Sequence, residues 1–410
     1  MSNSVYRRCG CRDENGRQYG AACPQLADSR HGAWGYYLSH GTDPKTGRRR
    51  QFRKTGYPTK RAALSALAEL RTQLDRGTYI RPTARTLGEY ALEWLPRRER
   101  SDKGLRATTV AGYEFYIRDD IAPSALGGMK LTEIRRYHVS EFVADLTKAG
   151  RGTVTVRRLV TLLGTIFASA LKDELIVSNP AREVEKPKLD DEEVRPWEPD
   201  QVRTFLDRCA HHRLGPLFEV AILTGLRRGE ITGLRWSDVD LATRKIVVRR
   251  NRVTANGRVL EQKTTKTKAG LRTVPLSDFA VATLLAWQLA QAQEAEAAQE
   301  VWRTEGHVFT MEDGRPLDPA YVTRLFQKLR KAGGEELPPL TFHGLRHCHA
   351  ALLIASHADI AVISKLLGHA SITVTSNVYG HLIGTVASDA VNGAAKLIAH
   401  TAHTPEGVSA

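Results

Sequence analysis

Several features that define common protein classes are missing from this sequence. Its 410 residues include only five cysteines, which is too few for a scaffold built on disulfide bonds. No stretch resembles a membrane span and the start of the chain has no apolar signal core, so a soluble cytoplasmic protein is predicted. A glycine-rich loop ending in Lys-Ser or Lys-Thr is absent, so nothing indicates the use of ATP. Histidine and aspartate are too scattered for a nuclease site with two metal ions.

Acidic residues are scarce relative to basic ones. The chain has 60 Lys plus Arg against 45 Asp plus Glu, a formal net charge of +15 with a pI near 9.7. Such an excess favours nucleic acid as the partner, although an anionic membrane surface would attract it too. The excess is concentrated in residues 1–85, which contain 17 Lys or Arg and 6 Asp or Glu.

The chain is long enough for two or three domains, and its patterns divide it into segments. Residues 1–82 predict a basic N-terminal domain with a small sheet and one helix. Apolar residues at helical spacing predict a helical domain over residues 86–185. Proline and charge dominate a linker over residues 186–196, and residues 197–396 mix helices with a small sheet. The polar residues 397–410 predict a flexible tail. The fold class is therefore multidomain, mainly α with small β-sheets.

The N-terminal domain contains the first candidate DNA-binding residues. An aromatic run after His31 and an alternating basic run that ends near residue 56 predict two strands, and Thr59 is placed to cap the helix that follows. The basic residues of the second run are the candidates for DNA contact: Arg48, Arg49, Arg50, Arg53 and Lys54.

A possible metal site also lies in this domain. Cys9, Cys11, Cys23 and His31 offer the four ligands that a structural zinc ion requires. The single residue between Cys9 and Cys11 is a tighter gap than the usual two to four. The alternative interpretation is three reduced thiols in a flexible start of the chain.

Five short motifs in the last segment contain residues suited to phosphodiester chemistry without a metal. They are Thr224-Gly-Leu-Arg-Arg-Gly-Glu-Ile-Thr-Gly-Leu, Lys263-Thr-Thr-Lys-Thr-Lys-Ala-Gly-Leu-Arg-Thr-Val-Pro-Leu, His343-Gly-Leu-Arg-His, Leu367-Gly-His and Asn377-Val-Tyr-Gly-His. Each motif alone has an ordinary explanation, such as an exposed helix arginine, a surface histidine pair, a helix cap or a packing tyrosine. Their joint occurrence favours a single site.

Breaking a phosphodiester bond without metal requires three kinds of group. Two arginines can hold the nonbridging oxygens and stabilise the charge of the transition state. A tyrosine can attack phosphorus and retain the bond energy as an ester. A lysine or histidine can transfer the protons. The five motifs supply every one of these groups.

The order Arg, Lys, His-x-x-Arg, His, Tyr resembles that of the tyrosine recombinases of the phage-integrase type. The resemblance implies Tyr379 as nucleophile, Arg227 and Arg346 as phosphate clamps, and His343 and His369 as partners in the site. Lys266 fits the general acid best, although Lys263 and Lys268 flank it, and Glu230 would orient the site. The resemblance is strong over residues 197–385, moderate over 86–185 and weak over 1–82. It is most evident toward integrases of actinobacterial phages and integrative plasmids.

The resemblance also implies how such a protein works. It predicts site-specific recombination of duplex DNA through a 3′-phosphotyrosyl intermediate, by a homotetramer that needs neither metal nor nucleotide for catalysis. The helical domain would bind core sites of the attachment DNA, and the N-terminal domain would bind arm sites. An excision factor and a host DNA-bending protein are implied as accessory partners. A helix over residues 386–399 would be exchanged between protomers or would pack within its own chain.

Two other functions remain open from the sequence. One is a topoisomerase of the type IB kind, which shares this chemistry but relaxes any duplex. The other is a DNA-binding regulator with a non-catalytic site. The filled catalytic positions argue against the regulator, and the separate basic domain argues against the topoisomerase.

Overall fold

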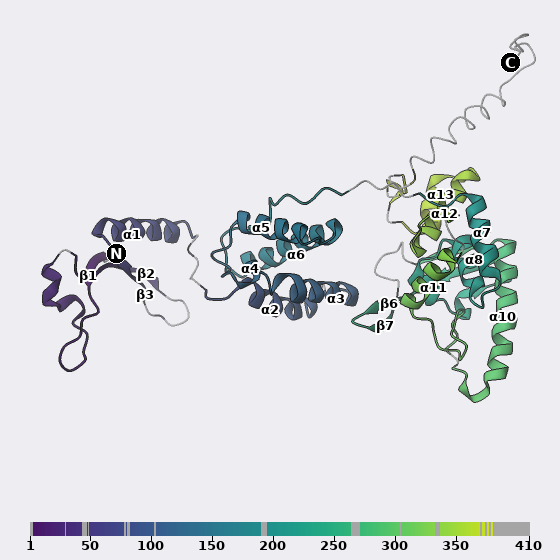
Figure 1. Ribbon diagram of the computed structural model, residues 1–410, viewed down its shortest axis with the longest axis horizontal. Helices are drawn as coiled ribbons and strands as arrows, with labels where there is room; N and C mark the ends of the chain where they lie inside the picture. The colour runs from purple at the N-terminus through teal and green to yellow at the C-terminus, as the bar shows by residue number, and fades with distance from the viewer. Residues whose placement is uncertain are drawn as a thin grey trace, which may run out of the picture. The chain divides into compact units, whose positions relative to one another are not determined.

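The computed structural model describes residues 3–379, apart from residues 29, 43–46, 48, 78, 80–82, 102–103, 190–194, 264–270, 304, 333–336, 370, 374 and 377–378 (Figure 1). It divides into two compact units, one formed by Met1–Gly104 with Tyr113–Leu189 and the other by Leu105–Gly112 with Asp190–Ala410. The division is coarser than the segments expected from the sequence, whose boundaries stay predictions. The predicted 386–399 helix and 397–410 tail lie outside the described residues.

The N-terminal segment is a three-stranded antiparallel sheet with one helix. Its strands run in the order β1 (Asn3–Arg8), β2 (Ala33–Thr42), β3 (Arg49–Tyr57), and α1 spans Lys60–Asp75. Thr59 caps α1 as predicted, because its hydroxyl accepts from the Ala62 backbone N–H at 3.1 Å. Tyr36 and Leu38 of the sheet and Leu67 and Leu70 of α1 form a small buried cluster. The strand β1 was not expected from its short, polar sequence.

The next segment is helical, as predicted. Its helices are α2 (Leu87–Glu99), α3 (Ala107–Tyr116), α4 (Ala125–Gly128), α5 (Arg136–Lys148) and α6 (Thr153–Lys172), and a π-helical turn over Ile117–Ile121 follows α3. Thr86 and Glu89 form a capping box at the start of α2, as their spacing in the sequence predicts. The Thr86 backbone N–H donates to Glu89 Oε2 at 2.9 Å, and the Glu89 backbone N–H donates to Thr86 Oγ1 at 3.3 Å. The sequence pattern predicts a helix from Thr132, but α5 begins later, at Arg136, since Lys130 is bridged to Thr86, residues 131–133 form a turn and Arg135 is extended.

The helix α6 is long and apolar enough to cross a membrane by length and composition, in contrast to the prediction that no stretch resembles a membrane span. A core helix of a folded bundle passes the same test. One face of α6 is buried in the protein: Val156, Leu159, Val160, Leu162, Leu163, Ile166, Phe167 and Ala170. Its apolar composition is therefore accounted for by packing within the helical segment.

The last segment mixes helices with two small sheets. Its helices are α7 (Pro199–Ala210), α8 (Gly215–Thr224), α9 (Arg228–Thr232), α10 (Asp278–Ala298), α11 (Pro319–Lys331), α12 (Phe342–Ala355) and α13 (Ile360–Leu367). The strands β4 (Val239–Asp240), β5 (Lys245–Val248) and β8 (Arg272–Pro275) form one antiparallel sheet, and β6 (Arg250–Ala255) and β7 (Arg258–Lys263) form a hairpin. The predicted fold class, mainly α with small β-sheets, is confirmed.

The sequence of residues 244–252 has strand character throughout, but the prediction of one strand there is wrong in one respect. The chain forms β5 and then β6, which belong to different sheets. Arg249 lies between the two strands, and both Arg249 and Arg250 bind the buried carboxylate of Asp238. Two consecutive residues of one straight strand would point to opposite faces, so this shared contact marks the break.

A large aromatic and aliphatic core supports this segment. Trp197, at its start, packs against Phe205 of α7 and Phe326 of α11, with ring centroids 5.2 and 6.1 Å apart. The indole N–H of Trp197 donates to the Pro338 carbonyl at 3.0 Å, and its backbone N–H lies 3.3 Å from Cys348 Sγ in α12. The core therefore fixes α12, the helix that carries the His-x-x-Arg motif.

Candidate active site

The site begins where α8 ends. Gly225 closes this helix with a left-handed φ of 62°, and a Cβ there would lie 2.6 Å from the ring of His349. Only glycine satisfies both conditions without strain. The chain then turns so that Arg227 immediately precedes α9 and its backbone N–H donates to Glu230 Oε2 at 2.8 Å. The Arg227 side chain, 37% exposed, donates to Glu230 Oε1 at 2.9 Å and to the Gly368 carbonyl at 3.2 Å.

Glu230 is the single carboxylate that orders the arginines of the site. It is 5% exposed and accepts two hydrogen bonds from Arg272 of β8, at 2.9 and 2.8 Å. Burial alone would raise the pKa of Glu230, but the hydrogen bonds from Arg272 and the charges of Arg272 and Arg227 lower it to about 2. Arg272 also donates to the Leu366 carbonyl at 2.8 Å, which ties β8 to the end of α13. Glu230 is thus ionised and holds two guanidinium groups in fixed positions.

Arg346 projects from α12 into the same region and is 2% exposed. Its guanidinium donates to the Gly225 carbonyl at 2.7 Å and to the Leu367 carbonyl. Burial, with the nearby charges of Arg227 and Arg272, lowers the pKa of Arg346 to about 9, so it remains a cation at neutral pH. His343 lies one helical turn earlier, exposed, with its pKa lowered by partial desolvation and by the charges of Arg346 and Arg227.

His369 follows Gly368, which ends α13 in the left-handed conformation with a φ of 65°. Its Nδ1 lies 2.8 Å from the hydroxyl of Thr375. Desolvation, with the charges of Arg346 and Arg227, lowers the pKa of His369 to about 4. The imidazole is therefore neutral at physiological pH and has one N–H to donate.

Tyr379 is buried, at 1% exposure, among Ala350, Ile354, Ile363 and Leu367. Its hydroxyl lies 2.7 Å from Nδ1 of His347. Burial raises the pKa of Tyr379 to about 12, although the charge of Arg346 opposes the rise. Burial and the neighbouring His343 lower the pKa of His347 to about 4, so this ring is neutral, and in the tautomer with the proton on Nε2 its Nδ1 accepts the phenolic proton.

Five of the predicted catalytic residues and the supporting Glu230 are therefore brought together by α9, α12, α13 and the chain that follows α13. Among the described groups of the site, the three guanidinium groups of Arg227, Arg272 and Arg346 outnumber the carboxylate of Glu230, so their sum is positive. Buried or half-buried cations of fixed position suit a phosphate group, whose charge grows in the transition state of phosphoryl transfer. The sixth predicted residue, Lys266, lies outside the described residues.

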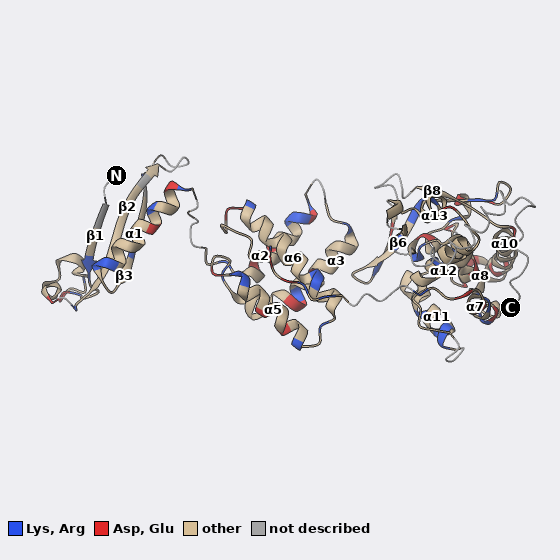
Figure 2. Cartoon of the chain, turned by 90° about the horizontal axis from the view of Figure 1, so that it is seen from above, with Lys and Arg blue, Asp and Glu red and all other residues tan. Residues whose placement is uncertain are grey.

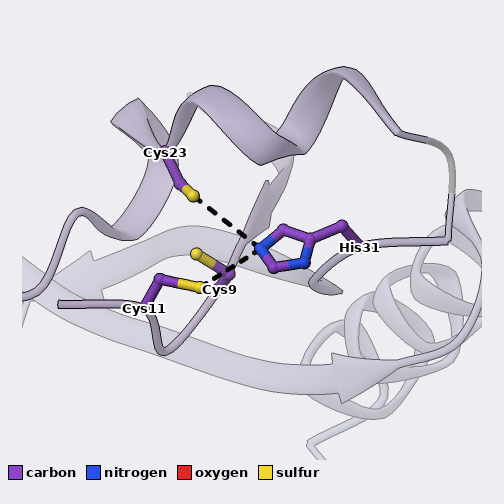
Figure 3. A group of neighbouring side chains, drawn as sticks. All are labelled: Cys9, Cys11, Cys23 and His31. Carbon is purple, nitrogen blue, oxygen red and sulfur yellow. Dashed lines mark hydrogen bonds between the residues drawn. The ribbon is translucent and has the colours of Figure 1, made fainter.

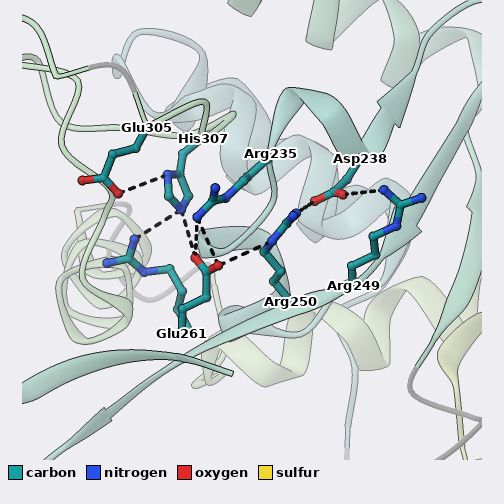
Figure 4. A network of polar contacts seen from close by, with 8 residues as sticks. Arg235, Asp238, Arg249, Arg250, Glu261, Glu305 and His307 are labelled. Carbon is teal, nitrogen blue, oxygen red and sulfur yellow. Dashed lines mark hydrogen bonds and ion pairs between the residues drawn. The ribbon is translucent and has the colours of Figure 1, made fainter. Parts of the chain in front are cut away.

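The hairpin that leads to Lys266 is anchored by a network of charged side chains (Figure 4). Glu261 of β7 accepts from Arg235 at 3.1 and 3.2 Å, and it lies 3.4 Å from Arg250 and 3.5 Å from His307. Arg250 also binds Asp238. These contacts bind both strands of the hairpin to the loops that carry Arg235 and His307. The network therefore fixes the strand that ends just before the segment containing Lys266.

Two residues of this site were not singled out from the sequence. Arg272 stands inside a motif already recognised, but its partners Glu230 and Leu366 are 42 and 94 residues away, so the sequence gives no sign of their contact. His347 is one of three histidines between residues 343 and 349, and the sequence does not distinguish it from His349. Its spacing of four from His343 was the available signal, because residues four apart share a helix face, and their rings lie 5.1 Å apart.

Two of the predicted DNA-binding residues of the N-terminal segment, Arg53 and Lys54, lie on opposite faces of its sheet; Figure 2 shows the Lys and Arg residues of the described chain in blue. Arg53 pairs with Tyr37 and lies over its ring at 5.1 Å, whereas Lys54 pairs with Tyr36, which faces α1. Successive strand residues point to opposite faces, so Arg53 lies on the open face and Lys54 on the other. Arg49 is exposed in β3, Arg48 lies outside the described residues, and the side chain of Arg50 is not described.

The four predicted metal ligands come together as well. The sulfur atoms of Cys9, Cys11 and Cys23 and a ring nitrogen of His31 all lie within 4.8 Å of one another (Figure 3). The other two cysteines, Cys209 and Cys348, are buried in the last segment. The N-terminal cluster (Cys9, Cys11, Cys23 and His31) is separate in sequence from the predicted catalytic residues and belongs to the other compact unit.

Comparison with known protein families agrees with this geometry. Residues 197–384 match the model of the phage integrase family, and residues 27–74 match that of an Arm DNA-binding domain. The first match covers every predicted catalytic residue. The second covers β2, β3 and nearly all of α1 but only one residue of the N-terminal cluster, His31.

Individual relatives extend the similarity. The chain is 28% identical over 328 residues to a tyrosine recombinase XerC-like protein of Caldanaerobacter subterraneus subsp. tengcongensis. The aligned region covers 76% of this chain and 83% of that protein. It is 27% identical over 341 residues to the ICEBs1 integrase of Bacillus subtilis, which covers 81% of this chain and 88% of that protein. The solved Tn1549 transposon integrase in complex with a circular intermediate DNA has the same fold, with a TM-score of 0.65 at 20% identity over 75% of this chain and 99% of that one. Residues 197–384 are thus a phage integrase family domain, and the relatives of the chain are named tyrosine recombinases and integrases, as the motifs predict.

Proposed function

We propose that this protein is a site-specific DNA recombinase that integrates or excises a mobile element, with Tyr379 as its nucleophile. The observation that carries the assignment is the buried Tyr379 hydroxyl, close to the fixed cation Arg346 and 2.7 Å from the neutral acceptor His347. A topoisomerase or a DNA-binding regulator would not explain a separate match to an Arm DNA-binding domain beside a full catalytic set.

In this mechanism Tyr379 attacks the scissile phosphate and forms a 3′-phosphotyrosyl bond while the bond to the 5′ oxygen breaks. Arg227 and Arg346 stabilise the added negative charge on the nonbridging oxygens. If the Thr375 hydroxyl donates to Nδ1 of His369, the Nε2–H of that ring is left to donate to phosphate. Reversal by a 5′ hydroxyl of a second duplex completes strand exchange and conserves the bond energy.

Two protons move in the cleavage step. The phenol, with its pKa at about 12, must lose its proton, and His347 Nδ1 is the acceptor in contact with it. The departing 5′ oxygen gains a proton from Lys266, which follows β7 in the sequence, and His343 assists in moving protons. No metal ion and no nucleotide takes part.

The partners follow from the same assignment. The solved Tn1549 relative is bound to a circular intermediate DNA, and duplex DNA is the substrate of this chain. The helical segment would bind core sites and the N-terminal sheet arm sites, within a homotetramer on two duplexes. An excision factor and a host DNA-bending protein would set the direction of the reaction. The place of action is the bacterial cytoplasm.

The test is covalent trapping on DNA that flanks the gene of this protein. The full chain is incubated with this DNA and EDTA, denatured with SDS, and examined for protein joined to DNA. We expect an adduct with wild type and with the control Tyr321→Phe, a partly buried tyrosine of α11, and none with Tyr379→Phe. An adduct that persists in Tyr379→Phe would refute the assigned nucleophile.

Two further outcomes address the alternatives. Binding of the same DNA in a gel shift without any adduct would favour a regulator. Relaxation of a supercoiled plasmid lacking the flanking DNA, at the rate seen with it, would favour a topoisomerase. Joining of two duplexes that both contain the site supports recombination.

A further inference from the structure

The stretch between β1 and β2 has almost nothing apolar to hold it together. It contains two short 3-10 helices, Gly20–Ala22 and Pro24–Ala27, joined by turns. Among its described residues, 9–28 and 30–31, only Cys9 and Cys23 are buried. A segment of this size without a hydrophobic core needs another form of cross-link to keep one conformation.

The sheet brings the ends of this stretch together. Arg8 pairs with Ala33 at the last position of the β1–β2 ladder, so Cys9 and His31 leave the sheet side by side. Gly32, which joins His31 to Ala33, has a φ of +81°, and a Cβ there would lie 2.8 Å from the Arg8 carbonyl oxygen. A glycine is thus required for the close approach that places His31 beside the strand end.

Backbone hydrogen bonds bring the remaining two cysteines to the same point. The Cys9 N–H donates to Gly20 O at 3.1 Å, and the Tyr19 N–H donates to Cys11 O at 2.9 Å. The second 3-10 helix begins directly after Cys23. All four side chains therefore converge from different turns of the chain (Figure 3).

The distances within the cluster are those of a tetrahedral metal site. Nε2 of His31 lies 3.3 Å from Cys11 Sγ and 3.7 Å from Cys23 Sγ. A sulfur about 2.3 Å and a nitrogen about 2.0 Å from one zinc ion, at the tetrahedral angle, lie about 3.5 Å apart. All separations among the four ligand atoms are at most 4.8 Å, and two sulfur atoms bound to the same zinc ion would lie about 3.8 Å apart.

We propose that Cys9, Cys11, Cys23 and His31 bind one zinc ion, which fixes the stretch between β1 and β2 onto the DNA-binding sheet. Three thiolates and one imidazole form a closed ligand set of the structural kind, with no position left for substrate. Disulfide pairing would leave the third thiol unpaired. The Gln25 amide, whose Oε1 lies 3.7 Å from Cys11 Sγ, can rotate so that its NH2 donates to the bound thiolate.

The test is the metal content of the purified full-length chain. We expect about one zinc ion per chain in wild type, and a loss of most of it in Cys11→Ser and His31→Ala, which remove half-buried ligands. Cys209→Ala is the matched control, because it removes a buried cysteine of α7 that lies outside the cluster, and it should retain the zinc. Zinc absent from wild type, or unchanged in both ligand variants, would overturn the proposal.

A second measurement does not depend on whether the variants fold. Wild-type chain stripped of metal under reducing conditions is titrated with Co²⁺ and followed by absorption. We expect a thiolate-to-cobalt charge-transfer band and tetrahedral ligand-field bands that saturate at one equivalent and disappear on addition of zinc. Their absence, or a disulfide between two of the three cysteines found by peptide mapping of the natively purified chain, would refute a zinc site. Neither readout requires recombination, so failure of the zinc proposal and failure of the proposed function are distinguishable.

Discussion

The predicted catalytic site and the N-terminal cluster each join side chains that are distant in sequence, but different forces hold them. Around Tyr379 and Arg346, helices packed on a large apolar core fix the geometry, and buried ion pairs complete it. Around Cys9 and His31 there is no core of comparable size, since the adjacent sheet and α1 bury a cluster of only four side chains. Phosphoryl transfer needs groups held to within fractions of an ångström. Binding of the DNA backbone by exposed basic strands needs charge more than fixed positions, and a small staple suffices for it.

The largest effect is expected at the buried ion pair between Arg272 and Glu230. We expect Arg272→Leu to lower the free energy of unfolding by about 3–5 kcal/mol, because it leaves Glu230 charged and buried without its main partner. Covalent adduct formation should fall with it, since Glu230 also holds Arg227. Thermal or denaturant unfolding of the full chain measures the first effect, and trapping measures the second.

Two further variants test whether burial of the ion pair explains the loss of stability expected for Arg272→Leu. Arg244→Leu breaks an ion pair with Asp278 in which both side chains are exposed, and it should cost at most about 1 kcal/mol. The double change Arg272→Leu with Glu230→Leu removes both charges and should recover part of the lost stability. Equal losses in Arg272→Leu and Arg244→Leu would contradict the distinction between the two kinds of site.

The sequence was sufficient for the parts of the site that depend on local order. Arg227, Glu230, His343 and Arg346 lie within short motifs, and a helix or a turn brings the members of each motif together. Arg272 could not be assigned in this way because β8, α9 and α13 meet only in the folded chain. The break between β5 and β6 escaped prediction for a related reason, since it depends on the long-range contact of two arginines with Asp238.

The contact between His347 and Tyr379 offers a sharper test of fixed geometry. His347→Ala leaves a buried phenol without its acceptor, which costs about 1–3 kcal/mol, and we expect the single-turnover rate of adduct formation to fall about tenfold. His347→Asn restores an acceptor oxygen and should recover part of the rate, while the acid limb of the pH–rate profile shifts. A rate unaffected by His347→Ala would show that this ring only packs against the tyrosine.

Acid should destabilise the catalytic segment through its buried histidines. Burial, with a smaller contribution from Arg346, lowers the pKa of His349 to about 4 from an ordinary 6.5. Below pH 6.5 the unfolded chain therefore binds a proton that the folded chain refuses, so stability falls down to about pH 4, by up to about 1.4 kcal/mol per pH unit. His349→Gln keeps a polar side chain that does not titrate, and it should reduce the slope of unfolding free energy against pH by about one proton. An unchanged slope would show that His349 is charged when folded.

The smallest effects are expected on the N-terminal sheet, where single charges act nearly independently. Arg53→Gln removes a cation from the open face, beside Tyr37, whereas Lys54→Gln removes one from the face toward α1. If the open face binds DNA, Arg53→Gln should weaken arm-site binding and reduce the slope of log affinity against log salt by about one, and Lys54→Gln should change that slope less. Fluorescence anisotropy at several salt concentrations measures both variants, with the core-site adduct as an internal control that neither should change. Equal loss of slope in the two variants would mean that the basic residues act as a diffuse charge. The face of the sheet on which each cation lies would then not matter for DNA binding.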